Sequence, residues 1–485
     1  MLHPRSRSRL ITAASLLALA GLAAACREAA AGGSEGVPAW PDTLPGASAF
    51  GAPRGHSPVR AAIHVHTIIS HDACDGDPVD EAGRPNEACL ERFRRAICSA
   101  RLGAVFVTDH DRRMVDVDSL AEALLLRDGD AVIRVDGRVR ASRVTCPGGG
   151  ALLFPGAENQ LMPIALDSLP RGSREQKRAF WDADTAGAAA AFRAYGAVVL
   201  LPHPEDEPLA TIAALDPDGI EVYNPHANFA FKHRANQGLS RFGAVLDLLP
   251  FYLRTTAAHP DLALLPMFRA NHDAIDKWDA LLGSGRDVVG FGASDAHENA
   301  LPWTLADGER GDAYERLLPW VTNVLLVAAA DPVTTGDVEA IEDAVRRGRF
   351  YVAIEAWGTP RGFDFRLEGP RGVAEMGTSV PPAAGQRLIV EPPRVAVLSA
   401  AQSAPDVRVR LYRIDAGRRT IVAESAGRID VPVEGPGAYR VEVGIVPRHL
   451  EPYLGGTGDL REVPWIYSNP IRVTAPAAEP GAPRS

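Results

Sequence analysis

The stretch Ala61-Ala-Ile-His-Val-His-Thr-Ile-Ile-Ser-His-Asp72 decides how this chain folds. Apolar residues surround His64 and His66, which is typical of the end of a buried strand. Side chains two residues apart on a strand point to the same face, so both imidazoles are expected to leave the strand together. His71 and Asp72 follow after a short turn and offer a further nitrogen or carboxylate ligand close by.

Later segments repeat this pattern of an apolar strand that ends in metal-ligand residues. They are 104–111 with Asp109 and His110, 151–158 with Glu158, 197–204 with His203, and 288–297 with Asp295 and His297. Ligands at the ends of successive parallel strands converge at one mouth of a barrel. A cluster of imidazoles and carboxylates there is typical of a divalent transition-metal site. The alternative interpretation is that these histidines are incidental residues of buried strands.

In this order, the motifs His-x-His-Thr, Thr-Asp-His, Gly-x-Glu, His-Pro and Ser-Asp-Ala-His resemble those of the polymerase-and-histidinol-phosphatase (PHP) phosphoesterase superfamily. Similarity to its carbaryl-hydrolase-like (CehA/McbA) branch rests on the segments 219–224, 278–282, 292–297 and 345–352. The resemblance covers about residues 60–354 and implies a distorted (βα)7 TIM-like barrel. The alternation of strands and helices alone indicates a parallel α/β sheet, closed or open.

The resemblance also implies a set of metal ligands. It places His64, His66, Glu158 and Asp295 around one ion, with Asp72, His110, His203 and His297 completing the others. Asp72 and His71 compete for one position, and we favour Asp72. Members with three metals carry a further histidine soon after the Gly-x-Glu motif, and segment 159–166 contains none. We therefore expect one or two divalent ions per chain, with zinc, manganese and iron all open.

Three residues are candidates for a direct part in the chemistry. His233 lies between Lys232 and Arg234, where it would bind a substrate anion or donate a proton to a leaving group. Asp109 and Asn224 lie at strand ends, and Asn224 is interpreted as an amide that lines the site. The remaining nearby histidines are expected to satisfy hydrogen bonds of loops: His226, His259 and His272.

Water bound to a divalent ion is acidified and can attack an ester. The expected function is therefore a metal-dependent hydrolase, in the first place a phosphoesterase, acting on a small extracytoplasmic ester. A carbamate or carboxylic ester hydrolase of the carbaryl-hydrolase type is the close alternative. A different class is a non-catalytic envelope lipoprotein that keeps metal for its structure.

The amino terminus predicts export. A basic start precedes the apolar run 10–25, which is too short to span a bilayer and is typical of a signal peptide. Residues 22–26 resemble a lipobox ending at Cys26, so residues 1–25 are expected to be removed and Cys26 lipidated; ordinary signal cleavage is the open alternative. Residues 26–58, rich in Ala, Gly and Pro, read as a flexible tether. The predicted location is the periplasm or the outer membrane of a bacterium, with membrane contact only through Cys26.

The net charge and the cysteine content limit which partners and which cellular compartment are expected. The formal net charge of −10 argues against nucleic-acid binding. Besides Cys26, the chain has Cys74, Cys89, Cys98 and Cys146, an even number that suggests disulfides in an exported protein. Cys74 and Cys89 flank a polar insertion and are the pair expected first. Zinc ligation by these thiols is the competing interpretation.

The periodicity of apolar residues predicts the helices, strands and domains of the rest of the chain. Helices are predicted at 88–100, 118–126, 183–195, 241–249 (stopped by Pro250), 273–282 and 337–347, and a hairpin at 131–144. Residues 59–357 form the predicted metallohydrolase domain. Residues 358–475 alternate with period two and predict a β-sandwich, either for packing or for recognition of a carbohydrate-sized ligand. Residues 476–485 are expected to be disordered, and the oligomeric state is left open.

Overall fold

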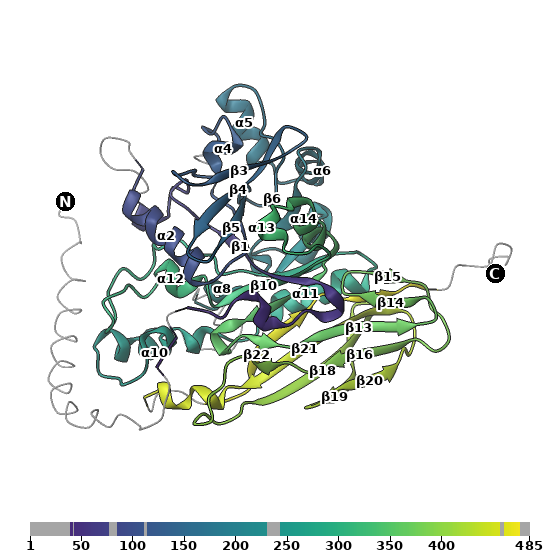
Figure 1. Cartoon of the computed structure of the whole chain (residues 1–485). Helices are drawn as coiled ribbons and strands as arrows, with labels where there is room; N and C mark the ends of the chain where they lie inside the picture. Colours follow the sequence, from purple (N-terminus) through teal and green to yellow (C-terminus); the bar gives the residue numbers. More distant parts are fainter. Residues whose placement is uncertain are drawn as a thin grey trace, which may run out of the picture.

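The computed structural model describes residues 39–41, 43–76, 85–110, 114–229, 243–455 and 460–475. The signal, most of the tether, His233 and the tail 476–485 lie outside these residues. The fold is mixed α/β, with one sheet of 13 strands, two sheets of four and one strand pair (Figure 1). Within the described ranges, no helix combines the length and apolar character needed to cross a bilayer.

The elements are bounded as follows. The strands before residue 358 are β1 Ser57–Val65, β2 Ala104–Val107, β3 Ala131–Val135, β4 Arg138–Cys146, β5 Gly149–Phe154, β6 Met162–Ile164, β7 Val198–Leu201, β8 Gly219–Tyr223, β9 Val289–Gly292, β10 Val321–Val327 and β11 Phe350–Ile354. The strands after it are β12 Pro360–Arg361, β13 Asp364–Gly369, β14 Gly372–Glu375, β15 Ser379–Val380, β16 Arg387–Glu391, β17 Arg394–Val395, β18 Asp406–Asp415, β19 Arg418–Ser425, β20 Ile429–Pro432, β21 Gly437–Val446, β22 Val463–Ser468 and β23 Ile471–Val473. The α-helices are α2 Glu87–Ser99, α4 Leu120–Ala123, α5 Arg174–Trp181, α6 Ala186–Ala194, α7 Leu209–Leu215, α8 Pro225–Phe229, α10 Gly243–Tyr252, α11 His272–Gly283, α12 Tyr314–Leu317, α13 Pro332–Thr335 and α14 Val338–Arg347.

Two groups of parallel strands carry the predicted ligands. Strand β2 lies between β1 and β5 and is parallel to both, and β8 lies in the same way between β7 and β9. These strands are short and almost wholly buried, as expected for parallel strands covered on both faces. The predicted parallel pairing is found within these two groups, whereas β10 is antiparallel to both β1 and β11, and β6 is antiparallel to β7.

The two groups meet at their ends. Gly156, after β5, forms a single bridge with Ile164 of β6, and Val65 of β1 forms one with Ala296, after β9. Both bridges lie beside ligand residues. The continuous ladders of the described strands stay in separate sheets.

Most predicted helices are present with shifted ends. Helices α2, α6, α11 and α14 and the hairpin β3–β4 confirm the periodicity. The helix predicted at 118–126 is shorter, since α4 has only four residues. The prediction that Pro250 stops its helix is wrong: α10 continues to Tyr252. Pro250 lies inside the last turn of α10, two residues before its end.

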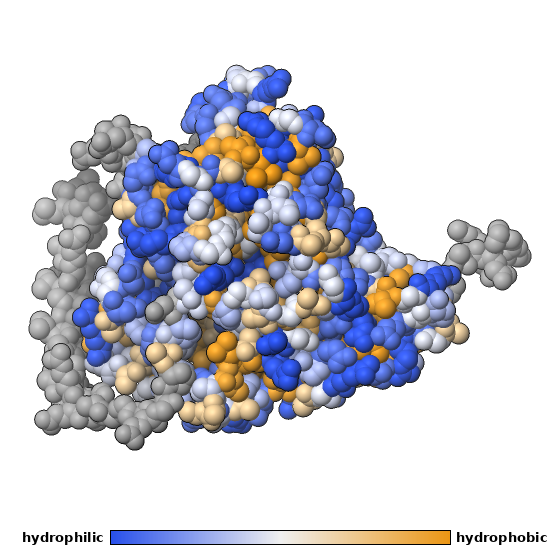
Figure 2. Space-filling model, in the orientation of Figure 1, coloured by the Kyte–Doolittle hydropathy of each residue, from blue (hydrophilic) through white to orange (hydrophobic). Residues whose placement is uncertain are grey.

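The strands after residue 358 extend the sheet that carries the candidate site. Strand β22 pairs antiparallel with β11 and with β21, so the 13-stranded sheet runs across the expected domain boundary. The four-stranded sheet β14-β13-β16-β20 lies on the same side of the molecule (Figure 1). Apolar residues of both sheets belong to one buried core cluster. On the face shown in Figure 2, hydrophilic residues predominate and apolar ones surface in small patches.

Two buried polar contacts connect these later strands to the site-bearing part. Arg440 of β21 is fully buried and donates to both oxygens of Asp279 on α11, at 2.8 and 2.9 Å. Its guanidinium also lies 5.0 Å from the Trp278 ring centroid. Asn469 exchanges hydrogen bonds with the backbone of Gly290 in β9. The later strands therefore support the strand that leads to Asp295.

Two disulfides join the four remaining cysteines. The Cys74–Cys89 pair is confirmed, and Cys98 is bonded to Cys146. The first lies beside the candidate site, and the second ties α2 to the end of β4. Disulfide bonding is thus the correct interpretation of these thiols, and zinc ligation is wrong.

We predict that removing the Cys98–Cys146 bond destabilises the protein more than removing Cys74–Cys89. The sequence separations are 48 and 15 residues. Chain-entropy arguments give each bond a few kcal/mol and the longer loop about 1 kcal/mol more. Urea unfolding of the two double Cys→Ala variants checks this order, and an equal or reversed loss would contradict it.

Candidate metal centre

The structure brings all eight predicted ligand residues into one cluster at the strand ends. Three overlapping groups have donor atoms within 4.8 Å of one another: His66, Asp72, His110 and His297; His64, His203 and Asp295; and His64, His66 and Glu158. Most of these side chains are buried. The arrangement is compatible with a bound metal ion, because imidazole nitrogens and carboxylate oxygens are the ligands that transition metals take in proteins.

Glu158 lies at the centre of this cluster. Its Oε1 is 3.2 Å from His64 Nε2 and 3.3 Å from His203 Nε2. Its Oε2 is 3.2 Å from His66 Nε2 and 3.4 Å from His110 Nδ1. Each carboxylate oxygen therefore faces a different pair of imidazoles.

Asp295 and Asp72 lie on either side of Glu158. The Oδ1 atom of Asp295 is 3.3 Å from His64 Nε2 and 3.4 Å from His66 Nε2. The Oδ2 atom of Asp72 is 3.3 Å from His110 Nε2 and 3.6 Å from His297 Nε2.

The competition between His71 and Asp72 has a geometric answer. The ring of His71 lies 5.2 Å from that of His110, and His71 belongs to none of the three donor groups. The carboxylate of Asp72 belongs to the first group. The structure favours Asp72 as the ligand.

Three of these side chains are directed toward the cluster by unusual backbone conformations. His64, His203 and Asp295 have φ values of 66°, 44° and 50°. Residues other than glycine adopt this left-handed region at a cost, and such residues gather at functional sites. The register between β1 and β2 also shifts around His64. Simple strand alternation was therefore an incomplete explanation for the convergence of His64 and His66.

A second layer of polar residues holds the imidazoles. Glu221 of β8 is buried, and its Oε2 is 2.7 Å from His64 Nδ1. Ser70 Oγ lies 3.2 Å from His66 Nδ1 and donates to Asp72 Oδ1 at 2.8 Å. Such partners fix the ring orientation and leave the other nitrogen free for a ligand. Sequence reasoning missed both, although a carboxylate inside the apolar strand 219–223 was an available signal.

Burial and neighbouring charges shift the pKa values of the cluster residues, often in opposite directions. Burial alone raises the pKa of Glu158 and Asp295, but the imidazole charges, that of His64 foremost, outweigh it and hold both well below their usual range. Burial lowers the pKa of His66, yet the carboxylates of Asp295 and Glu158, at 3.4 and 3.2 Å from its Nε2, raise it to about 9. For His297, burial and the charge of His66 lower the pKa to about 3. The carboxylates are thus in the ionised form that metal binding requires.

The three predicted catalytic residues have different outcomes. Asp109 is buried, and its carboxylate accepts hydrogen bonds from Thr67 N, Thr67 Oγ1 and Ser70 N at 2.6, 2.8 and 3.1 Å. These contacts give Asp109 a role in positioning Thr67 and Ser70, and its expected catalytic role stays a prediction. Asn224 is buried and accepts from the backbone N–H of His226. His233 lies outside the described residues.

His226 was interpreted from the sequence as a loop residue, and the structure places it at the cluster. Its Nδ1 contacts Asp295 Oδ2, and its ring centroid is 6.2 Å from that of His203. About half of its side chain is exposed. The charge of Asp295 raises the pKa of His226. A lone histidine beyond a strand gave no signal of this position.

The cluster borders a small cavity of about 70 Å³. Its polar lining includes His226, Asp295 and His297 of the cluster region, together with Ser294, Glu298, Asn299 and Asp312. Its other walls are mainly apolar: Leu264, Met267, Leu301, Leu317 and Trp320. An apolar group of a bound molecule can therefore lie directly beside the donor atoms.

Comparisons of the chain with family models, with curated proteins and with solved structures gave no match.

We predict that Asp109→Asn destabilises the protein by about 2–3 kcal/mol. An amide cannot accept from all three donors at once, and a buried donor left unsatisfied costs about 1–3 kcal/mol. Chemical denaturation measures the loss. Asp116→Asn is the matched control, because the carboxylate of Asp116 pairs with Arg174 at the surface. An Asp109 variant as stable as this control would contradict the positioning role.

Proposed function

We propose that this protein is a metal-dependent hydrolase of the PHP type, in the first place a phosphoesterase. The observation that carries the proposal is the meeting of eight imidazole and carboxylate side chains from separate segments at one cluster. A merely structural role for so many ionisable groups would require each to find a partner within the protein.

The donor atoms themselves fit a metal. His64 Nε2, His66 Nε2, Glu158 Oε2 and Asp295 Oδ1 are buried, and none has a hydrogen-bond partner among the described residues. Unsatisfied buried polar atoms are costly, and divalent cations would satisfy these four together.

The way in which the donor atoms divide among the three groups supports a site for two metal ions. The Nδ1 atoms of His64 and His66 face Glu221 and Ser70, so each ring has only Nε2 left for an ion. Two of the three donor groups have no member in common, and Glu158 contacts both. We propose His64, His203 and Asp295 around one ion and His66, Asp72, His110 and His297 around the other. Zinc, manganese or iron would suit this donor set.

Ions bound there would acidify water to a nucleophile and polarise the ester oxygen. The protein's own contribution is orientation and exclusion of water. Glu221 and Ser70 hold the imidazoles in place. His226 borders both the cluster and the cavity, and we assign it the role of holding a proton near the leaving group.

The cavity favours a substrate with a small apolar part. Its walls of Leu301, Leu317 and Trp320 would accept an alkyl or aryl ester group next to Asp295. The same feature suits an aryl carbamate or carboxylic ester, which is the second candidate function.

We also propose that seven strands form the distorted barrel of the PHP fold. They are β1, β2, β5, β6, β7, β8 and β9. Pairing connects them in this order, with single bridges between β5 and β6 and between β9 and β1. Export with a lipidated Cys26 remains part of the proposal. Two disulfides support an oxidising compartment.

The test measures whether the purified protein hydrolyses an aryl phosphate, a phosphodiester or an aryl carbamate. The metal content of the same protein is measured alongside. We expect bound transition metal. We also expect turnover to fall by at least about a thousandfold on chelation, and in Glu158→Gln and Asp295→Asn, because the activated water is lost. Added zinc or manganese should restore the chelated enzyme but not these variants.

The control variant is His56→Ala, because within the described ranges the His56 ring has a hydrogen bond only with the nearby Pro53 carbonyl, and His56 lies outside the cluster. Metal-free protein with full turnover would contradict the proposal. Turnover confined to the carbamate would select the second candidate function, and bound metal without any turnover would indicate a structural role.

A further inference from the structure

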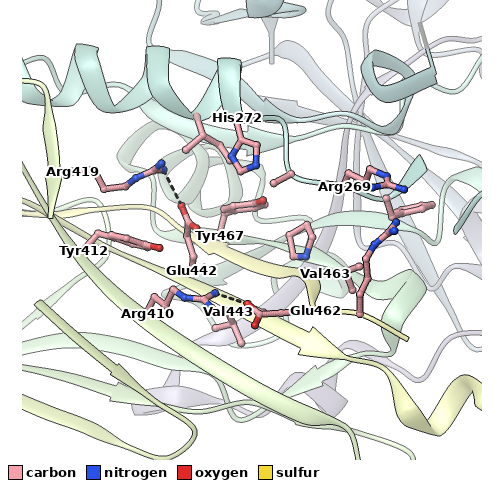
Figure 3. A pocket seen from close by; sticks show the side chains of 16 residues that line it. Arg269, His272, Arg410, Tyr412, Arg419, Glu442, Val443, Glu462, Val463 and Tyr467 are labelled. Atoms are coloured by element: carbon pink, nitrogen blue, oxygen red, sulfur yellow. Dashed lines mark hydrogen bonds and ion pairs between the residues drawn. The ribbon is translucent and has the colours of Figure 1, made fainter. Parts of the chain in front are cut away.

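A second cavity lies on the other side of α11, against the later strands. It has a volume of about 450 Å³ and is lined from the segment 268–275 on one side and from β18, β19, β21 and β22 on the other. Figure 3 shows His272 and Arg269 facing the strand residues across it. None of the eight cluster residues lines this cavity.

Positive charge dominates the lining. Four arginines border the cavity, against two acids: Arg269, Arg410, Arg419 and Arg461 against Glu442 and Glu462. Such a cluster is unusual in a chain with a formal net charge of −10. Clefts lined by one sign of charge concentrate ligands of the opposite sign.

Arg410, Arg419 and Arg461 differ in how closely they pair with acids. Arg410 is tightly paired with Glu462 at 2.5 Å (Figure 3). The pairs of Arg419 with Asp276, Asp279 and Glu442 are all longer, at 3.3–3.5 Å. Charge-assisted hydrogen bonds usually measure 2.7–2.9 Å. The contacts of Arg419 with these acids are therefore long enough for an anion to compete for its N–H groups, and Arg461 makes no ion pair with an acid in the described part of the chain.

An apolar groove adjoins this cavity. It measures about 400 Å³ and shares Arg269, Arg461 and Val463 with the cationic cavity, so these residues lie at the border of the two. Leu265, Phe251 and Trp357 are among its apolar walls. A molecule bound across the border would place an anionic head among the arginines and an apolar tail in the groove.

We propose that these two cavities together bind an anionic amphiphile, with a carboxylate or phosphorus-acid head and an alkyl tail. Guanidinium groups bind both kinds of head in a bidentate manner. The tail contributes by burying apolar surface. The site is separate from the metal centre and does not depend on the proposed hydrolysis.

The test is calorimetric titration of the full chain with octanoate and octyl phosphonate, against acetate and methyl phosphonate. The phosphonates contain no ester bond that a hydrolase could cleave. We expect the octyl compounds to bind at least about tenfold more tightly, since a fully buried methylene is worth roughly fourfold in affinity. The preferred head distinguishes a fatty acid from a phospholipid-like source.

Variants locate the site. Arg461→Gln and Arg419→Gln should each weaken binding about tenfold, as expected for loss of a charge-assisted hydrogen bond. Leu265→Ser should reduce the dependence on chain length. Arg428→Gln is the matched control, because Arg428 is half-exposed and pairs with Glu391 and Asp430 outside both cavities. Arg461 is partly exposed and outside the core, so its variant keeps the test valid if Arg419→Gln fails to fold.

The outcomes separate the possibilities. Binding that is unchanged in both arginine variants, or equal for long and short chains, overturns the proposal. Binding that is lost in Glu158→Gln also overturns it, because the ligand would then occupy the metal centre.

Discussion

The electrostatics of Glu158 and Asp295 constrain the rest of this structure. Both carboxylates are buried, and burying a charge costs several kcal/mol unless partners compensate for it. The compensation here comes from imidazoles that separate strands deliver to the same place. Burial lowers the pKa of His203, but Glu158 and other acids more than reverse this and raise it to about 10. The strand ends must therefore meet, because the acids would otherwise lie unpaired in the core.

This constraint explains why the later strands are continuous with the site-bearing ones. Asp295 follows β9, and β9 is held from behind by Asn469 and by α11, which Arg440 anchors through Asp279. A shift of β9 would move a carboxylate away from two imidazoles. Packing of the later strands thus contributes directly to the geometry of the cluster, which favours the packing interpretation of that region. The cationic cavity is lined by the segment that leads into α11 and by the same later strands.

Much of the fold and the cluster could be predicted from the sequence, because the signals were local. Apolar runs ending in His, Asp or Glu identified the strands, and one to three donors at or after the end of each of five strands were enough to place the eight residues together. A closed ring of strands could not be derived in this way. The proposed barrel rests on single bridges at Gly156 and Val65, which carry no periodic pattern. Long-range partners were also hidden: nothing near Glu221 in the sequence indicates His64, and nothing near His226 indicates Asp295. The hydrogen bonds of Asp109 to Thr67 and Ser70 were hidden as well, because the sequence does not show that these residues pack against its carboxylate.

The left-handed backbone at His64, His203 and Asp295 has a consequence for protein engineering. Grafting the motif His-x-His onto a regular strand of another scaffold would reproduce the residue types but not the directions of their side chains. A transplant would have to bring the bulged strand and its supporting neighbours as one unit. The chemistry of this centre is in that sense encoded in torsion angles as much as in residue types.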